Sequence, residues 1–343
     1  MTKLILQPAA YYFPTTVLLV DDNQKYLMNL ENILDTDAAI YKPFNNPLEV
    51  FEYIKKHSKH PTLPNSCIER EIDRVNFNHK IEIKIQPIQQ EVFNSKRFEH
   101  ISALVADHDM PEMKGLELFR KIKDLDLPIR KILLTGAATI QQALDAYNEG
   151  IIDQYITKDE DDFPARLNEA IKTQCDEQFK SDTSVIIKNI ILKDQASCLN
   201  SEVYMTLLDS IIKKHNISEY YLIDDKGSYI FFDNDANSSW FIVKNQAILN
   251  ADIARAEHSE VALPTEIMRQ LKEHKLILTY RSEHDKEIPP KDWMPKGLLH
   301  SAKKFTSENQ DYYYTYINKD VSTNTIDKNK IVSFYQYQDQ LPG

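Results

Sequence analysis

The sequence predicts an α/β protein with a doubly wound, five-stranded parallel sheet, followed by a smaller α+β domain. Its 343 residues exceed the ~100–200 residues of a typical single domain. Strand-like and helix-like segments alternate over residues 1–180, which is typical of a parallel sheet whose strands are joined by helices. Over residues 181–343 strand-like runs gather between helices, which favours a small antiparallel sheet.

The elements of the first domain follow from local patterns. Short aliphatic runs predict strands buried on both faces, and apolar residues at helical spacing predict the helices between them. Pro47 lies near the first turn of one helix and Gly150 ends another, positions that these residues favour. The predicted strands are residues 15–20, 38–44, 101–106, 130–136 and 153–158, and the predicted helices are residues 23–34, 46–56, 115–123, 139–150 and 163–179.

One stretch interrupts this alternation. The segment between His57 and Phe98 is about forty residues long, where a compact α/β unit has a loop of ~2–6 residues. Residues 80–87 alternate apolar and polar side chains, which predicts a half-exposed strand. We therefore expect an insertion over residues 58–98 with structure of its own, in which this strand lies beside the edge of the sheet.

The second domain, residues 181–343, is expected to begin with an amphipathic helix over residues 201–216, with Ser201 as its N-cap. Residues 219–233 contain two apolar runs around an Asp-Lys-Gly turn, which predicts a β-hairpin. The other predicted elements are strands at 238–243, 312–318 and 330–337, and helices at 246–258 and 264–275.

Composition limits the function. The formal net charge of −11 disfavours nucleic-acid binding, which needs a basic face. Cys67, Cys175 and Cys198 are odd in number and lack metal-site spacing, which favours reduced thiols in a cytoplasmic protein. The first residues do not resemble a signal peptide, and no apolar run approaches the ~20 residues of a membrane span. We expect a soluble protein in the cytoplasm.

Polar residues end four of the predicted strands. Asp21 and Asp22 follow the first strand and Asp107 follows the third, while Thr135 and Lys158 lie at the ends of the fourth and the last. In the strand order 2-1-3-4-5 these ends converge on one edge of the sheet. Three adjacent carboxylates repel one another unless a cation is present, and Mg²⁺ prefers such oxygen ligands. Because lysine and threonine both donate to phosphoryl oxygens, the set predicts phosphoryl transfer onto a carboxylate.

These residues lie in four motifs that resemble the receiver domain of two-component response regulators. The motifs are LVDDN at 19–23, VADHDMPEMKG at 105–115, LLTGA at 133–137 and YITK at 155–158. The acidic pair, the Asp-x-x-Met-Pro sequence, the threonine and the lysine occur in the order found in that family. The resemblance covers about residues 13–180, apart from the insertion, and implies a flavodoxin-like receiver fold.

The resemblance also implies a role for each site residue. Asp107 would be the phosphoacceptor, supplied by a sensor histidine kinase, and Thr135 and Lys158 would bind the phosphoryl group. Tyr155 would be the aromatic residue that turns inward when the phosphoryl group arrives. Such a receiver catalyses only its own phosphorylation and dephosphorylation, so no other enzymatic activity is expected of it.

The resemblance implies Mg²⁺ as the cofactor, held by Asp21, Asp22, Asp107 and the backbone carbonyl of Asp109. His108 lies beside the acceptor at a position that varies among receivers, so a loop residue is the simpler interpretation than a catalytic base.

One departure from the family concerns the residue after Lys158. Receivers usually have proline there, often after a cis peptide bond, whereas this chain has Asp159. A cis bond without proline costs ~3 kcal/mol, so either a trans bond reshapes the loop or strain is retained. This departure motivates one alternative, a pseudo-receiver that acts without phosphorylation.

The sequence of the second domain contains fewer motifs that indicate a function than the sequence of the first domain. Acidic residues outnumber basic ones there, and no helix-turn-helix or Gly-rich phosphate loop is apparent. We expect phosphorylation-dependent homodimerisation through helix 139–150, strand 153–157 and helix 163–179, or binding of an unnamed downstream protein. The tyrosine-rich run at 312–316 favours another alternative, an output domain that binds or processes nucleic acid or nucleotides.

The insertion, Asp159 and the hairpin followed by the SWFIV sequence are similar to the Legionella-type quorum-sensing response regulators. That resemblance implies a histidine kinase that responds to a small α-hydroxyketone autoinducer.

Overall fold

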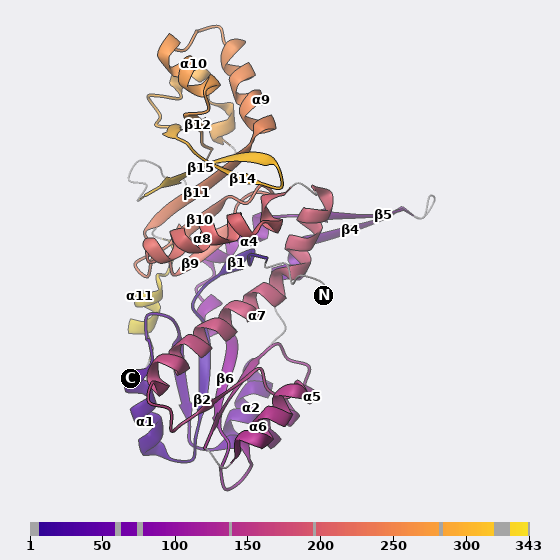
Figure 1. Cartoon of the computed structure of the whole chain (residues 1–343), viewed down its shortest axis with the longest axis vertical. Coiled ribbons are helices and arrows are strands. Elements are labelled where there is room, and N and C mark those ends of the chain that lie inside the picture. Colours follow the sequence, from indigo (N-terminus) through magenta and orange to yellow (C-terminus); the bar gives the residue numbers. More distant parts are fainter. Residues whose placement is uncertain are drawn as a thin grey trace. The chain divides into compact units, whose positions relative to one another are not determined.

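The computed structural model describes residues 7–58, 63–73, 78–136, 139–194, 197–280, 284–318 and 330–341. The chain forms two compact units, each assembled from separate stretches (Figure 1). One unit contains residues 12–65, 94–183 and 334–343, and we call it the parallel-sheet unit. The other contains residues 1–11, 66–93 and 184–333, and we call it the antiparallel-sheet unit.

A five-stranded parallel sheet forms the centre of the parallel-sheet unit, in the order β3-β2-β6-β7-β8. This is the predicted order 2-1-3-4-5, and the predicted fold class is confirmed. Every residue of β2 and β6 is buried, as expected for aliphatic strands covered on both faces. The strands are β2 (Thr16–Val20), β3 (Ile40–Phe44), β6 (Ile101–Asp107), β7 (Arg130–Thr135) and β8 (Gln154–Thr157).

Helices cover both faces of this sheet, and each face has its own hydrophobic core. Helices α2 (Pro47–His57), α5 (Gly115–Asp124) and α6 (Ile140–Asn148) pack on one face. Helices α1 (Gln24–Ile33) and α7 (Phe163–Lys193) pack on the other. The alternation of side chains along a strand explains this division, because Leu18 and Leu104 belong to the first core and Val17 and Ala103 to the second.

Helix α7 is longer than predicted. It continues from residue 179 to Lys193, and its last part, from Ser184, belongs to the antiparallel-sheet unit. The extension contains neither Gly nor Pro, and Ile186, Ile187 and Ile190 are buried at helical spacing. The extension therefore has the pattern of a helix, and the prediction ended it too early.

The C-terminal segment was predicted incorrectly. Residues 330–337 were expected to form a strand, but Phe334–Asp339 form helix α11, which belongs to the parallel-sheet unit. Phe334 and Tyr337 lie three residues apart and both pack against the ring of Phe98. Residues at this spacing share one face of a helix, so a tertiary contact overrides the strand preference of aromatic residues.

The antiparallel-sheet unit contains a six-stranded sheet in the order β1-β9-β10-β11-β15-β14, whose pairs from β9 to β14 are antiparallel. The predicted hairpin is confirmed as β9 and β10, joined by a turn with Gly227 at a φ of 89°. The edge strand β1 comes from the N-terminal segment and was not predicted. The strands are β1 (Tyr11–Tyr12), β9 (Glu219–Leu222), β10 (Tyr229–Phe232), β11 (Ser238–Asn245), β14 (Lys303–Ser307) and β15 (Gln310–Ile317).

Three predicted helices of this unit are confirmed as α8 (Glu202–Lys214), α9 (Gln246–Glu257) and α10 (Thr265–Lys272). Ser201 caps α8, since its hydroxyl accepts the N–H of Tyr204. A second small sheet pairs β12 (Leu276–Leu278) with β13 (Leu299–Ser301). The buried Trp293 belongs to a core that this sheet shares with α9 and α10. Short 3₁₀ helices lie at Cys198–Asn200, His284–Glu287 and Pro290–Asp292.

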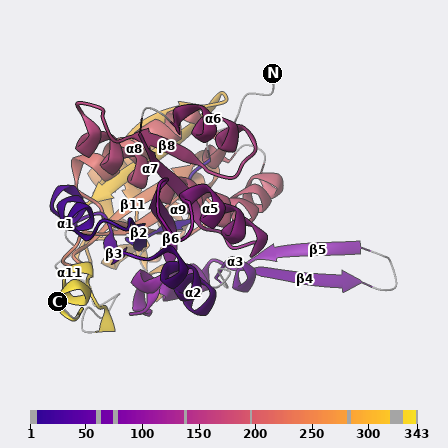
Figure 2. The same cartoon turned by 90° about the horizontal axis from the view of Figure 1, so that it is seen from below.

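The insertion forms local structure, but its strand is not at the edge of the main sheet. Strand β5 (Asn78–Ile83) pairs with β4 (Ile68–Asp73) in a separate antiparallel hairpin, seen in Figures 1 and 2. A partner close in sequence requires little loop-closure entropy, which favours the local pairing. The other elements here are α3 (Leu63–Ser66), α4 (Gln86–Gln90) and the 3₁₀ helices Glu91–Phe93 and Arg97–Glu99.

Residues 66–93 of the insertion belong to the antiparallel-sheet unit. The side-chain amide of Gln89 donates to the carbonyl of Ile223, directly after β9, at 3.0 Å. Among the described residues, no helix is long and apolar enough to span a membrane.

Candidate functional site

Four strand ends of the parallel sheet bring the predicted site residues to one edge. Asp21 and Asp22 follow β2, Asp107 ends β6, Thr135 ends β7 and Lys158 follows β8. The carboxylates of Asp21, Asp22 and Asp107 offer oxygens that all lie within 4.8 Å of one another. Asp21 and Asp107 are buried, whereas Asp22 is exposed.

Lys158 bridges two of these carboxylates. Its Nζ lies 2.9 Å from Asp21 Oδ2 and 2.8 Å from Asp107 Oδ1, and it also lies 4.0 Å from the centre of the Tyr26 ring. Burial alone would lower the pKa of Lys158, but its hydrogen bonds to Asp107 and Asp21 outweigh burial and raise that pKa. The lysine is therefore protonated at pH 7. Three carboxylates and one ammonium leave a formal charge of −2 in this cluster.

Burial raises the pKa of Asp21, although hydrogen bonds from Lys158 and from the N–H of Asn23 act in the opposite direction. Lys158 is shared with Asp107, so Asp21 receives only part of its stabilisation. A carboxylate whose charge is disfavoured by burial gains from a further cation.

Backbone hydrogen bonds orient both buried carboxylates. Asn23 N–H donates to Asp21 Oδ1 at 2.9 Å, and Asp109 N–H donates to Asp107 Oδ2 at 3.1 Å. Each carboxylate thus uses one oxygen for the backbone and the other for Lys158. Asn23 also caps α1 with its side chain, which fixes the turn after β2.

Gly115 allows α5 to begin directly against the end of β6. A Cβ atom at this position would lie 2.2 Å from the carbonyl oxygen of Asp107, and no real side chain fits there. This glycine is part of the motif at 105–115, so its requirement has a signal in the sequence.

Thr135 is fully buried, and its hydroxyl bonds to the Thr139 hydroxyl and donates to the Gly136 carbonyl at 3.2 Å. Thr139 is the N-cap position of α6. Tyr155 is half-buried on β8 and packs against the core under α2, α5 and α6. The described chain contains no cis peptide bond, so the bond between Lys158 and Asp159 is trans.

Three residues near the cluster were not predicted: Tyr26, Thr139 and Gln142. Tyr26 lies under Lys158, Thr139 bonds to Thr135, and Gln142 bonds to the imidazole of His108 at 3.1 Å. Each belongs to a helix or its cap, where a polar residue is unremarkable in sequence. Only the folded arrangement relates them to the acidic edge.

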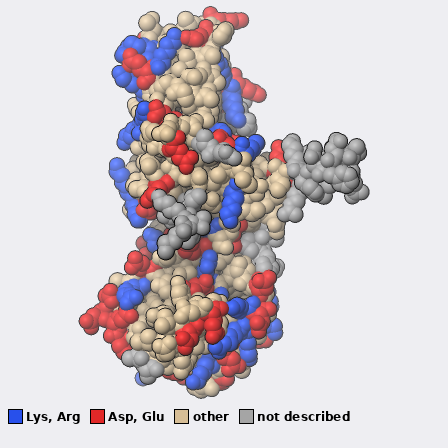
Figure 3. All heavy atoms as spheres, turned by 45° about the vertical axis from the view of Figure 1, so that its right-hand side comes forward, with Lys and Arg blue, Asp and Glu red and all other residues tan. Residues whose placement is uncertain are grey.

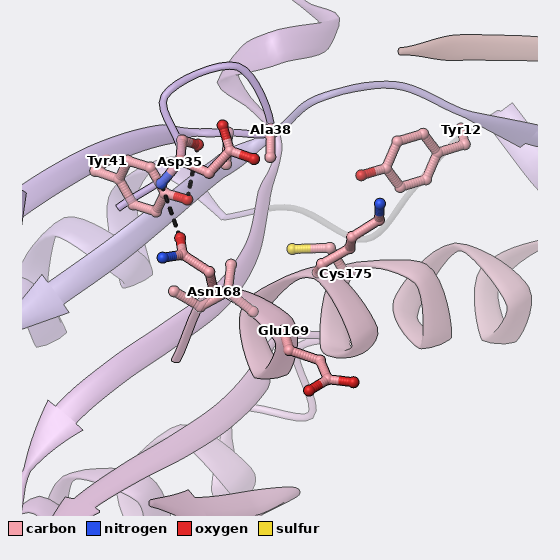
Figure 4. Close-up of a pocket in the computed structure, with 10 residues that line it drawn as sticks. Tyr12, Asp35, Ala38, Tyr41, Asn168, Glu169 and Cys175 are labelled. Atoms are coloured by element: carbon pink, nitrogen blue, oxygen red, sulfur yellow. Dashed lines mark hydrogen bonds between the residues drawn. The ribbon is translucent and has the colours of Figure 1, made fainter. Parts of the chain in front are cut away.

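A cavity of about 210 Å³ lies elsewhere in this unit, between α7 and the loop that leads into the amino end of β3 (Figure 4). Asn168 secures that loop, because its amide donates to the Ile33 carbonyl and its oxygen accepts the N–H of Asp35. Burial raises the pKa of the Cys175 thiol to about 11, so this lining group is neutral at pH 7. Asp21, Asp22 and Asp107 lie at the opposite ends of the strands and do not line the cavity. Its lining residues are Tyr12, Asp35, Ala38, Ala39, Tyr41, Asn168, Glu169, Ile171, Lys172 and Cys175.

The parallel fold and the acidic edge with its bridging lysine define the receiver class of signalling proteins. Residues 68–172 match the family described as response regulator receiver domain. The match includes Asp107, Thr135 and Lys158 and begins inside the insertion, after the acidic pair.

The chain is also similar over most of its length to a solved structure of the response regulator LqsR of Legionella pneumophila. The two are 30% identical, the alignment covers 98% of this chain and 96% of that one, and the TM-score is 0.76. A segment of 50 residues is 40% identical to the transcriptional regulatory protein FixJ of Rhizobium meliloti, but it spans only 24% of that relative and 15% of this chain. The chain belongs to the response regulators of two-component systems.

Proposed function

We propose that the chain is a phosphorylation-driven switch in which Asp107 accepts a phosphoryl group from a sensor histidine kinase. The observation that carries this proposal is the bridge of Lys158 between the buried carboxylates of Asp21 and Asp107. In the transfer, a carboxylate oxygen of Asp107 bonds to phosphorus and the bond from phosphorus to the kinase histidine breaks. Lys158 neutralises charge on the entering phosphoryl oxygens, and the Thr135 hydroxyl donates to one of them.

The acidic cluster suits Mg²⁺. Its formal charge of −2 equals the charge that one divalent ion neutralises, and its ligands are oxygens. Asp21, Asp22 and Asp107 would hold the ion together with the backbone carbonyl of Asp109. When bound, Mg²⁺ neutralises charge that develops on the phosphoryl oxygens.

We infer that the output of the switch is homodimerisation through α6, β8 and α7. Ile140, Leu144 and Tyr147 are exposed on α6 by 38%, 38% and 52%, and their spacing places them along one stripe of the helix. Exposed apolar side chains in such a stripe suit a protein–protein contact. Tyr155 on β8 would change this face when it packs inward.

The proposal includes a cytoplasmic location and a quorum-sensing kinase that responds to a small α-hydroxyketone. Both follow from the resemblance to the Legionella-type quorum-sensing response regulators and from the similarity to LqsR. The antiparallel-sheet unit acts here as a binding module without enzymatic activity, whose downstream protein partner is not identified.

Mass spectrometry after treatment with acetyl phosphate and Mg²⁺ tests the acceptor. The wild type should gain one phosphoryl group, and Asp107→Asn should gain none while keeping the circular dichroism of the folded chain. Asp109→Asn is the matched control, since Asp109 is an exposed acid two residues away, and it should still be labelled. An unlabelled wild type would favour the pseudo-receiver, and labelling of Asp107→Asn would move the acceptor to another residue.

Sedimentation with and without beryllofluoride, a phosphoryl mimic, tests the dimer. The wild type should gain mass with beryllofluoride, and Leu144→Glu should lose this gain because it places a charge in the apolar stripe. Leu48→Glu, a matched change at an exposed leucine of α2, should respond as the wild type does. Identical masses in all states would exclude homodimerisation as the output.

Fluorescence polarisation with labelled DNA tests the nucleic-acid alternative. On the face drawn in Figure 3, acidic and basic side chains are intermixed, and the net charge of the chain is −11. We expect little binding at physiological salt. A sub-micromolar affinity that falls steeply with salt would favour the alternative.

A further inference from the structure

His108, the residue after the acceptor, lies where three elements meet. Its backbone N–H donates to the Leu134 carbonyl of β7, and its carbonyl accepts the N–H of Gly115 at the start of α5, both at 3.0 Å. Its imidazole Nε2 lies 3.1 Å from Oε1 of Gln142 on α6. Only 2% of His108 is exposed, whereas Gln142 is exposed, so the contact with α6 is part-buried at the edge of the protein surface.

Among the described residues, Gln142 is the hydrogen-bond partner of this imidazole. Nδ1 of His108 is buried and makes no hydrogen bond to any described residue. The side-chain oxygen of Asp109 lies 3.9 Å from Nε2, beyond hydrogen-bond distance. Loss of the Gln142 contact would leave both ring nitrogens without a protein partner, which disfavours this position of the ring. The folded state therefore keeps His108 and α6 together.

A second contact reaches the same side of α6. Thr139 bonds to Thr135, and Gln142 lies three residues further along the chain. Residues at this spacing share one helix face. The start of α6 is thus attached both to Thr135, which ends β7, and to His108, the residue after the acceptor. Ile140, Leu144 and Tyr147 are exposed on the same helix.

We propose that the hydrogen bond between His108 and Gln142 transmits the phosphorylation state of Asp107 to α6. This inference rests on the proposed function and names the positioning residues through which it is regulated. Oδ2 of Asp107 accepts the N–H of Asp109, so residues 107–109 form a short turn around His108. A phosphoryl group on Asp107 changes the hydrogen bonding of that turn. His108 moves with its backbone, and Gln142 carries the movement to the exposed stripe of α6.

The test compares Gln142→Met with Gln141→Met. The two glutamines are adjacent on α6, but the amide of Gln141 bonds to Asp145 within the helix. Phosphoryl uptake is measured by mass spectrometry, and the response of α6 by hydrogen exchange of residues 140–148 with and without beryllofluoride. Gln142→Met should take up phosphoryl as the wild type does, while its exchange response shrinks at least about fivefold, the lower range of coupling between sites. Gln141→Met should match the wild type in both measurements.

Gln142→Glu keeps an oxygen that accepts from Nε2–H and should restore the response. A full exchange response in Gln142→Met would overturn the inference, and so would equal loss of uptake and response. If Gln142→Met does not fold, Gln142→Ala is measured in the same way and decides. A wild type that takes up no phosphoryl group would contradict the proposed function instead, so the two failures are distinguishable.

Discussion

The buried carboxylate of Asp21 serves the site but lowers the free energy of unfolding. Burial raises the pKa of this carboxyl above its ordinary value. Between the pKa of the unfolded chain and the higher pKa of the folded chain, the folded state binds more protons. The free energy of unfolding therefore falls as pH rises through that window, and at pH 7 the charged Asp21 destabilises the fold.

We predict that Asp21→Asn raises the thermal midpoint at pH 7 in metal-free buffer, and that this advantage disappears below the window. Mg²⁺ at about 100 times its dissociation constant should stabilise the wild type by ~2.7 kcal/mol, but not the variant. Thermal unfolding across pH, with and without Mg²⁺, measures both effects. Asp161→Asn, at an exposed acid, is the control, and an equal response to Mg²⁺ in both variants would contradict the role of Asp21.

Gly115 gives a second prediction at this scale. Gly115→Ala places a methyl group 2.2 Å from the Asp107 carbonyl oxygen, so α5 or the end of β6 must move. We expect a loss of ~1–3 kcal/mol in unfolding free energy and slower phosphoryl uptake. Denaturant unfolding measures the loss, with Gly136→Ala as the stability control because its methyl group meets no atom within 4 Å. Equal stability of the two variants would argue against this close contact.

Helix α11, at the C-terminal end of the described chain, packs on the parallel-sheet unit, whose other helices and strands come much earlier in the sequence. Phe334 is fully buried against Phe98, while Tyr335 and Gln338 bond to Asp37 and to the Thr36 carbonyl in the loop after α1. Phe98 in turn accepts a hydrogen bond at its carbonyl from the hydroxyl of Thr16 on β2. The helix is therefore part of the packing of the parallel sheet.

We predict that Phe334→Ala lowers the unfolding free energy by ~3–5 kcal/mol, the usual cost of removing a buried phenyl ring. Tyr335→Ala, at a side chain that is 37% exposed, should cost much less. Urea unfolding of both variants measures the two losses in unfolding free energy. Similar costs at the two positions would mean that α11 contributes little to the core.

The two units of the whole molecule are linked repeatedly by the backbone. Each contains three stretches of chain, and six stretches are joined by five passages between the units. The domain boundary predicted between residues 180 and 181 remains a prediction. It separates Phe98 from Phe334, and residues 66–93 from the sheet that contains β9.

We predict that a fragment of residues 1–180 unfolds at a lower temperature than the full chain. It loses the contact of Phe334 with Phe98 and the partner of Gln89 beside β9. Calorimetry of the fragment and the full chain measures the difference, and addition of a fragment of residues 181–343 should recover part of it. A fragment as stable as the parallel-sheet unit of the full chain would show that these contacts are dispensable.

The strand order followed from the doubly wound fold class. The sequence alone determined the strands of the parallel sheet and the acidic and basic residues at its edge. These follow from local patterns, because a buried strand is a short aliphatic run and the polar residue that ends it reaches the sheet edge. The inserted hairpin pairs apart from the main sheet because its two strands are close in sequence. Tertiary structure alone decided the contacts of Tyr26, Gln142 and α11. Each depends on which residues distant in sequence meet, and a burial gain between distant segments overrides local propensity without leaving a periodic signal.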